Sequence, residues 1–277
     1  MFAPKSLLFV PGDRPDRFAK AFGSAAEAVI IDLEDAVPTE RKEEARRAAA
    51  EWIDRGDCLE RLFLRMNAPG TAAAIADLAM LLDRSAAIAG LIVPKVEAAV
   101  VIEHLHSALA ERGFKPVLVP VIESARGLRL AGRIGRAPGV WGLALGPVDL
   151  ATQLGARFDG QALRQLRLQI SLGAAEAGVA AIDGPSLVIR DPENLAAEAS
   201  DGASLGFCAK LCIHPDQAAT VNAAFTPNAD EIAFARRVIA ADAEAKGAVF
   251  QLDGRMIDLP VVTGAHRVLA RAGLVPN

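Results

Sequence analysis

Residues 117–149 read VLVPVIESARGLRLAGRIGRAPGVWGLALGPVD, and this stretch contains the pattern that decides the fold. Its two apolar runs, Val117–Ile122 and Val140–Leu145, place Val, Leu, Ile and Ala on consecutive rather than alternate positions. Such runs are typical of strands that are buried on both faces, as in a parallel sheet. A carboxylate follows each run, Glu123 after the first and Asp149 after the second. The stretch therefore predicts two parallel strands with acidic side chains beyond their carboxyl ends.

The same alternation of apolar runs and Ala-rich amphipathic segments extends along most of the chain, and it predicts an α/β fold. Eight runs predict a closed (β/α)8 TIM barrel, whose usual size of about 250 residues suits this chain. An open doubly wound sheet is the alternative. The predicted strands are Leu7–Val10, Ala28–Leu33, Leu62–Met66, Gly90–Val93, Val117–Ile122, Val140–Leu145, Val179–Ile182 and Cys208–Ile213. The predicted helices include Glu40–Ile53, Ala72–Asp83, Ala98–Arg112, Gln161–Ala177 and Pro192–Ser204.

The chain continues beyond the last predicted strand. We assign residues 1–225 to the barrel and residues 226–277 to a C-terminal helical extension. Thr226-Pro227 followed by two acidic residues is a helix start. A turn at Gly254 and a final helix near Val261–Ala272 complete the extension. We expect it to cover a barrel face or to contact a neighbouring subunit.

Composition excludes several classes of protein. The 277 residues contain 30 Lys and Arg against 34 Asp and Glu, a net charge of −4, and only 5% aromatic residues with no Tyr. A strongly basic or aromatic nucleic-acid surface is therefore not expected. Three cysteines, an odd and sparse set, indicate a reducing, cytoplasmic setting. Charged residues near the N-terminus leave no apolar core for a signal peptide, so we expect none. No run of about 20 apolar residues exists, so we expect no membrane partner.

Ionisable residues stand at the carboxyl ends of nearly all the predicted strands, where α/β barrels hold their ligands. Glu123 and Asp149 follow consecutive strands, and two hard carboxylates suit Mg²⁺, with Mn²⁺ as an alternative. Each acid could instead cap a helix. Arg65 can bind a substrate carboxylate with two hydrogen bonds, or it can pair with a neighbouring acid such as Glu34.

Other residues carry weaker signals. Lys95 and Lys210 at strand ends raise the alternative of Schiff-base chemistry. Arg14 and Lys20 belong to a local cationic group that suits a phosphate or a solvated helix face. Cys208 and Cys212 hint at a metal, but a strand with small apolar residues is the better interpretation.

Nine short motifs carry a resemblance to a known family. They are Ser6–Gly12 (SLLFVPG), Asp32–Val37 (DLEDAV), Arg65–Asn67 (RMN), Pro94–Val96 (PKV), Ile122–Gly127 (IESARG), Gly146–Asp149 (GPVD), Ile182–Gly184 (IDG), Ile213–Pro215 (IHP) and Met256–Asp258 (MID). Together and in this order, they resemble the HpcH/HpaI aldolase and citrate lyase superfamily, in its citrate lyase beta-subunit-like and malyl- or citramalyl-CoA lyase-like branch. The sequence departs from the family's pattern at Ala209–Leu211, where Gly-Lys and an aromatic residue are common.

The resemblance implies a (β/α)8 barrel, Mg²⁺ and a homotrimer or hexamer. It implies roles for ten residues: Glu123 and Asp149 as metal ligands; Arg65 on the carboxylate of a 2-oxo acid; Phe9, Arg14 and Lys20 on coenzyme A; His214 and Pro215 at the substrate site; Glu34 and Asp35 on metal-bound water. It also implies that Asp258 is an acid supplied to a neighbouring subunit.

The implied reaction is Mg²⁺-dependent carbon–carbon cleavage or formation. A short β-hydroxyacyl-CoA, such as citramalyl-CoA, malyl-CoA or a citryl thioester, would give a 2-oxo acid and an acyl-CoA. The alternatives are a malyl-CoA-type thioesterase and a citrate lyase beta subunit that needs an acyl-carrier partner. The sequence does not choose among the acyl groups, because a methyl group changes discrimination by only about 1–3 kcal/mol.

Overall fold

The eight strands that the sequence predicts form a closed parallel barrel in a computed structural model, which describes residues 3–84, 87–156, 160–245 and 247–274. They pair in chain order, and the first strand pairs with the last, which excludes the open sheet. The strands are β1 (Ser6–Pro11), β2 (Ala28–Asp32), β3 (Leu62–Arg65), β4 (Gly90–Val93), β5 (Val117–Ile122), β6 (Gly142–Leu145), β7 (Ala180–Asp183) and β8 (Ala209–Cys212). The (β/α)8 prediction is confirmed.

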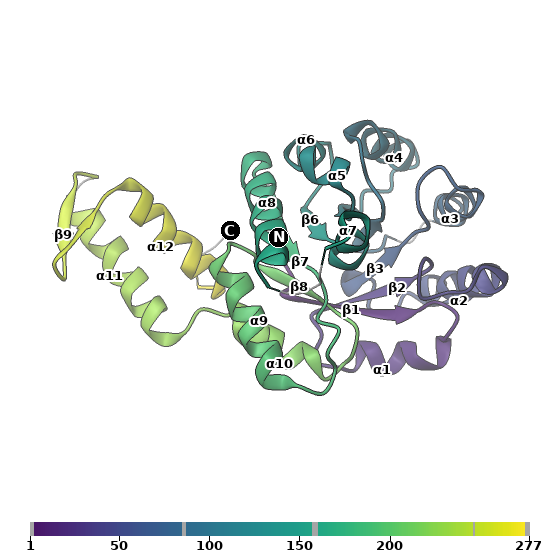
Figure 1. Ribbon diagram of the computed structural model, residues 1–277, viewed down its shortest axis with the longest axis horizontal. Coiled ribbons are helices and arrows are strands. Elements are labelled where there is room, and N and C mark those ends of the chain that lie inside the picture. Colours follow the sequence, from purple (N-terminus) through teal and green to yellow (C-terminus); the bar gives the residue numbers. More distant parts are fainter. Residues whose placement is uncertain (1–2, 85–86, 157–159, 246, 275–277) are drawn as a thin grey trace. The chain divides into compact units, whose positions relative to one another are not determined.

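Helices surround the barrel, as Figure 1 shows. They are α1 (Phe18–Phe22), α2 (Lys42–Arg55), α3 (Ala72–Leu82), α4 (Ala99–Glu111), α5 (Ala125–Arg129), α6 (Ala131–Gly135), α7 (Pro147–Leu154), α8 (Gly160–Ala177), α9 (Pro192–Ser204) and α10 (Gln217–Phe225), with 3-10 turns η1 (Pro15–Arg17), η2 (Thr39–Arg41) and η3 (Leu59–Arg61). The five long predicted helices are present. The short pair α5 and α6 was not predicted, because neither helix is long enough to show an apolar period.

The apolar runs are continuous because the strands bury both faces. One set of side chains fills the barrel interior, including Leu7, Ile30, Phe63, Val119 and Leu211. The remaining apolar positions pack outward against the helices, so all residues of β2, β4, β6 and β8 are buried. The polar residues that end the strands therefore gather at one rim of the barrel.

Pro4–Asn222 form one compact unit, the barrel unit, and a second, the C-terminal unit, begins at Ala223. This division lies within α10, a few residues before the boundary that the sequence suggested. The C-terminal unit contains α11 (Ala229–Ala245), an antiparallel hairpin of β9 (Phe250–Leu252) and β10 (Arg255–Ile257), and α12 (Leu259–Arg271). It has a core of its own, which includes Val238, Ile257 and Leu269.

No helix in the described part of the chain is both long enough and apolar enough to span a membrane.

Candidate active site

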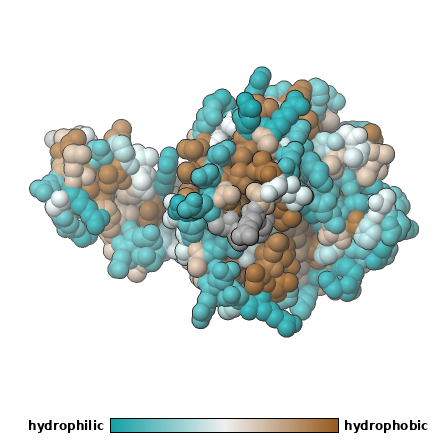
Figure 2. Space-filling view, in the orientation of Figure 1, coloured by the Kyte–Doolittle hydropathy of each residue, from teal (hydrophilic) through white to brown (hydrophobic). Residues whose placement is uncertain are grey.

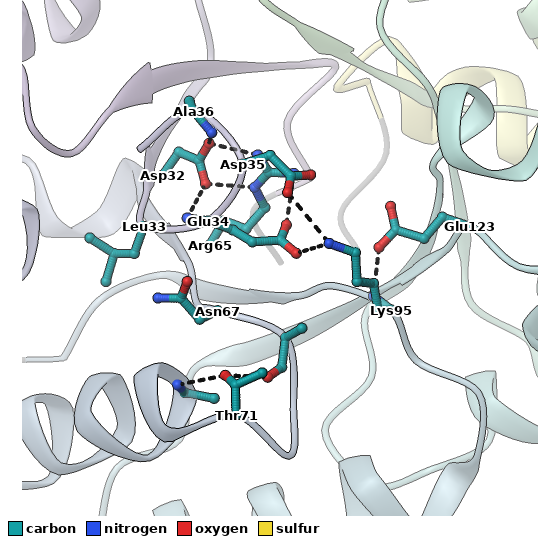
Figure 3. Close-up of polar contacts among 12 residues, drawn as sticks. Asp32, Leu33, Glu34, Asp35, Ala36, Arg65, Asn67, Thr71, Lys95 and Glu123 are labelled. Atoms are coloured by element: carbon teal, nitrogen blue, oxygen red, sulfur yellow. Dashed lines mark hydrogen bonds and ion pairs between the residues drawn. The ribbon is translucent and has the colours of Figure 1, made fainter. Parts of the chain in front are cut away.

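Arg65, at the end of β3, is held by the carboxylate of Asp32 at the end of β2. Its Nε and Nη2 donate to the two oxygens of Asp32, each at 2.6 Å (Figure 3). Asp32 also accepts the backbone N–H groups of Glu34 and Ala36, at 2.8 and 3.1 Å. Burial opposes the charge of Arg65, but the hydrogen bonds and charge of Asp32 raise its pKa above the usual value. Asp32 therefore fixes both the guanidinium and the loop that carries the next two acids.

The same guanidinium has further partners. Nη1 lies 3.2 Å from Glu34, so the predicted alternative of an ion pair with Glu34 is also realised. The ring of Phe9 lies 4.7 Å from the Arg65 guanidinium carbon, which is a cation–π contact. Arginine has five N–H donors, of which Asp32 takes two. Donors therefore remain on Arg65 for a carboxylate ligand.

Lys95 links the acids of the β2 loop. Its Nζ donates to Glu34 at 2.6 Å and to Asp35 at 3.4 Å (Figure 3). Glu34 is buried, and its burial raises its pKa although Lys95 and Arg65 act in the opposite direction. Lys42 donates to the backbone carbonyls of Leu33 and Glu34, which fixes the loop from its other side.

Glu123 lies directly after β5 and is 7% exposed. One of its oxygens accepts the backbone N–H of Lys95 at 2.6 Å, and Lys95 holds a left-handed φ of 54° to present it. Burial, the charge of Glu34 and the adjacent Asp149 raise the pKa of Glu123 to about 8. Gly146 lies against this carboxylate, since a Cβ there would stand 2.4 Å from the Cβ of Glu123. The absence of a side chain at Gly146 therefore leaves room for the side chain of Glu123.

Two cavities lie at this end of the barrel. The first, which we call the acid cavity, has a volume of about 140 Å³, and its polar lining residues are Asp35, Arg65, Glu123 and Asp149. The second, which we call the outer cavity, has a volume of about 450 Å³ and is lined by Phe9, Lys20, His214 and Pro215, among others. Phe9 lines both cavities, so they are neighbours.

The structure places most of the predicted site residues in these two walls. Glu34 and Arg14 are not among the lining residues: Glu34 is bound by Arg65 and Lys95, and the guanidinium of Arg14 pairs with Asp16, which itself lines the outer cavity. Asp258 belongs to the C-terminal unit, where its carboxylate accepts the Val261 N–H at 3.3 Å and caps α12. The role predicted for Asp258 stays a prediction.

The acid pair Glu123 and Asp149 fits a hard divalent cation. Two carboxylates in a partly desolvated wall repel one another, and a divalent cation would remove that repulsion. Within the described residues, no cluster of three or more His, Cys, Asp or Glu is arranged to hold a metal. Two carboxylates, with water and substrate oxygens at the other positions, are what Mg²⁺ commonly accepts.

The Schiff-base alternative finds no support in the lysines. Lys210 is fully buried, and its Nζ donates to Asp183, to the carbonyl of Gly184 and to Glu198 at 2.7–2.8 Å. Lys95 is held by two carboxylates, which raise its pKa above the usual value although burial acts in the opposite direction. Cys212 lies in β8, as the strand interpretation predicted, and burial raises the pKa of its thiol to about 12.

Two functional features were missed from the sequence. Asp32 begins the DLEDAV motif, but its part in holding Arg65 was not foreseen. Gln217 is buried and joins two loops: it accepts the N–H groups of Ile213 and His214 and donates to the carbonyl of Ser186. No pattern in the sequence distinguishes Gln217 from other glutamines, and only its tertiary contacts show its role.

A closed barrel with acids and Arg65 around one cavity at the carboxyl ends of its strands has its candidate site where TIM-barrel enzymes bind their ligands. The sequence profile of the HpcH/HpaI aldolase/citrate lyase family matches residues 5–215, and the chain belongs to this family.

Relatives span nearly the whole chain. The citrate lyase subunit beta-like protein of Mycobacterium tuberculosis is 41% identical over 275 residues, which cover 96% of this chain and 94% of that protein. The (3S)-malyl-CoA thioesterase of Cereibacter sphaeroides is 35% identical, with 97% and 94% covered. The crystal structure of protein CitE from M. tuberculosis, in complex with magnesium, acetoacetate and coenzyme A, superposes with a TM-score of 0.82 at 38% identity, covering 98% of both chains.

Proposed function

We propose that this protein is a Mg²⁺-dependent carbon–carbon lyase that cleaves or forms a short β-hydroxyacyl-CoA. The observation that carries the proposal is the wall of the acid cavity, where Glu123, Asp149 and Arg65 face one space. This set offers two ligands for a hard cation and one clamp for a carboxylate. The M. tuberculosis structures support the assignment, because one holds magnesium, acetoacetate and coenzyme A, and another holds magnesium and oxaloacetate.

Glu123 and Asp149 would hold the metal, and Arg65 would hold the carboxylate of the 2-oxo acid portion of the substrate. When bound, Mg²⁺ supplies the positive charge that favours ionisation of the substrate hydroxyl. The acyl-CoA portion would lie past Phe9 in the outer cavity, where Lys20 supplies a cation for phosphate. This arrangement fixes the reacting groups relative to one another, which lowers the entropic part of the barrier.

In the proposed cleavage each residue has one role. The hydroxyl proton passes to Asp35, directly or through water, and the oxygen's electrons form the carbonyl of the 2-oxo acid. The Cα–Cβ bond breaks, and its electron pair moves onto the thioester as an enolate. Asp258 donates a proton to the enolate carbon, which gives the acyl-CoA. In the reverse direction Asp258 removes that proton, and the enolate adds to the 2-oxo acid.

We assign Asp258 to a neighbouring copy in a homotrimer, or in a hexamer built from trimers. Apolar side chains flank Asp258 in the C-terminal unit and are open to solvent, Met256 at 69% and Leu259 at 76% exposure. The barrel unit exposes Leu187, Val188 and Ile189 in the loop after β7. Figure 2 shows apolar surface gathered in the middle of the barrel face that it presents. Exposed apolar surface on both units supports burial between copies.

Hydrolysis is the second candidate, and the relatives named (3S)-malyl-CoA thioesterase favour it. Water that reached the thioester would release free coenzyme A and a free acid. A third candidate, a subunit that acts on an acyl-carrier protein, is supported by a relative from Leuconostoc mesenteroides named citrate lyase subunit beta, which is 34% identical. The products distinguish all three reactions.

The test is a panel of malyl-, citramalyl- and citryl-CoA with Mg²⁺, in which the 2-oxo acid, acyl-CoA and free coenzyme A are measured together. A 2-oxo acid and an acyl-CoA in equal amounts are expected. Glu123→Ala is expected to abolish cleavage and Mg²⁺ binding with the circular dichroism spectrum unchanged. Glu97→Ala, at a partly exposed acid on the loop after β4, is the matched control. Full activity in EDTA, or free coenzyme A without a 2-oxo acid, would overturn the lyase proposal.

A further inference from the structure

The acid cavity has an uneven charge distribution in its wall. Among the described residues that line it, Arg65 is the only cation, and it faces the three acids Asp35, Glu123 and Asp149. Most of the other lining residues are apolar, and Val121, Leu145 and Leu211 among them are buried side chains. The cavity thus has a partner for one carboxylate and a large apolar area beside it.

In the Mg²⁺-loaded site, the carboxylate and the oxo oxygen of the 2-oxo acid would occupy Arg65 and the metal, so a second carboxylate on the ligand would meet no further cation among the described lining residues. It would lie against acids, which repel it, or against apolar side chains, where it would lose its hydration without compensation. Lys95 does not line the cavity, and its ammonium is already bound to Glu34 and Asp35. Arg65 has given two of its donors to Asp32, so it serves one ligand carboxylate.

The volume agrees with a small ligand. An apolar cavity of about 150 Å³ holds benzene, and the acid cavity measures about 140 Å³. Pyruvate has as many non-hydrogen atoms as benzene, whereas oxaloacetate carries a further carboxylate. The apolar wall offers contact to a methyl group, and burial of that group favours binding.

We propose that the 2-oxo acid of this enzyme is a monocarboxylate with a small apolar substituent, of the pyruvate type, and that Leu211 is a specificity-determining residue for it. Leu211 is 3% exposed and lines the cavity from β8, the strand next to the one that carries Phe9. Its branched side chain sets the space that the substituent occupies. The inference rests on the proposed function, which supplies the 2-oxo acid.

The test measures binding separately from turnover. Calorimetric titration of the Mg²⁺-loaded protein with pyruvate, glyoxylate and oxaloacetate is expected to give at least tenfold tighter binding of pyruvate than of oxaloacetate, with glyoxylate in between. Condensation of each acid with acetyl-CoA is expected to follow the same order in kcat/KM. Binding in this order without turnover would contradict the lyase proposal alone. Oxaloacetate that binds as tightly as pyruvate would overturn the inference.

Two variants test the wall itself. Leu211→Phe fills part of the space, so pyruvate binding is expected to weaken about tenfold more than glyoxylate binding. Val148→Lys places a cation at a partly exposed lining position, where it does not need to be buried. It is expected to tighten oxaloacetate binding at least tenfold relative to pyruvate. If neither variant changes the order or the ratios of the affinities for pyruvate, glyoxylate and oxaloacetate, this wall does not select the ligand and the inference fails.

Discussion

Asp32 and Arg65 lie directly opposite each other as the last residues of two neighbouring strands, β2 and β3. The barrel register therefore presents a carboxylate to both Nε and Nη2 of the guanidinium, and the flat side of Arg65 rests near Phe9. A long and otherwise adaptable side chain is thereby held in one orientation. The clamp that we propose for the substrate carboxylate is thus prepared before the substrate binds.

Asp32→Asn keeps the shape of this contact and removes its charge. Hydrogen bonds between charged groups contribute about 1.5–3 kcal/mol, so kcat/KM is expected to fall by roughly 10- to 100-fold, mainly through a higher KM for the 2-oxo acid. Steady-state kinetics in the condensation direction measure this. Asp54→Asn breaks an exposed pair with Arg84 and serves as the control, with little change expected. Unchanged kinetics in Asp32→Asn would show that Arg65 does not depend on Asp32.

The raised pKa of Glu123 makes Mg²⁺ binding depend on pH. In the metal-free protein this carboxyl binds a proton up to about pH 8, whereas the same group in an unfolded chain loses it near pH 4.5. The contribution of this carboxyl to the free energy of unfolding of the metal-free protein is therefore lost as the pH rises through about 8. Mg²⁺ needs the ionised form, so its affinity is expected to increase from pH 6 to pH 8, by at most about tenfold per unit.

Calorimetry in buffers with different ionisation enthalpies measures the protons that Mg²⁺ binding releases. About one proton per metal ion is expected at pH 6.5, and almost none at pH 9. The direction is fixed by the raised pKa of Glu123. No proton release at pH 6.5 would mean that Glu123 is already ionised or is not a ligand.

Lys210 is a structural residue in this barrel. Its ammonium is enclosed by Asp183, Glu198 and the carbonyl of Gly184, and Asp183 is also held by Arg167. Lys210→Met leaves two buried or half-buried acids with one partner fewer, and the free energy of unfolding is expected to fall by about 3–5 kcal/mol. Urea titration measures the change. The exposed Lys115→Met is the control, expected within about 0.5 kcal/mol. Borohydride trapping of pyruvate on Lys210 would contradict this assignment.

The assignment of Asp258 to a neighbouring copy is tested by mixing two inactive variants. Asp258→Asn keeps the cap of α12, because Asn caps as well as Asp, but it removes the acid. Arg65→Ala removes the clamp. Random mixing in a head-to-tail ring restores sites with both groups, and about a quarter of the wild-type rate is expected after joint refolding. A mixture as inactive as its components would place Asp258 in its own chain's site or outside the reaction.

The sequence predicted the barrel because each strand carries its own signal. The strand Ala28–Asp32, for example, is apolar up to its last residue, and the acid that ends it marks the ligand end. Which side chains bind each other at the carboxyl ends of the strands was not predictable in the same way. The contact between Asp32 and Arg65 depends on strand register. The hydrogen bond from the backbone of Lys95 to Glu123 depends on a left-handed backbone conformation, which a lysine in the sequence does not predict.

The left-handed backbone at Lys95 also bears on how the site could change during evolution. Its N–H orients Glu123 and its side chain pairs with Glu34, so one residue serves two parts of the site through separate atoms. Glycine adopts this φ freely and would preserve the first contact while deleting the second. Proline, which is locked near −65° and has no N–H, would delete the first. A single codon at this position is therefore constrained twice, once by geometry and once by charge.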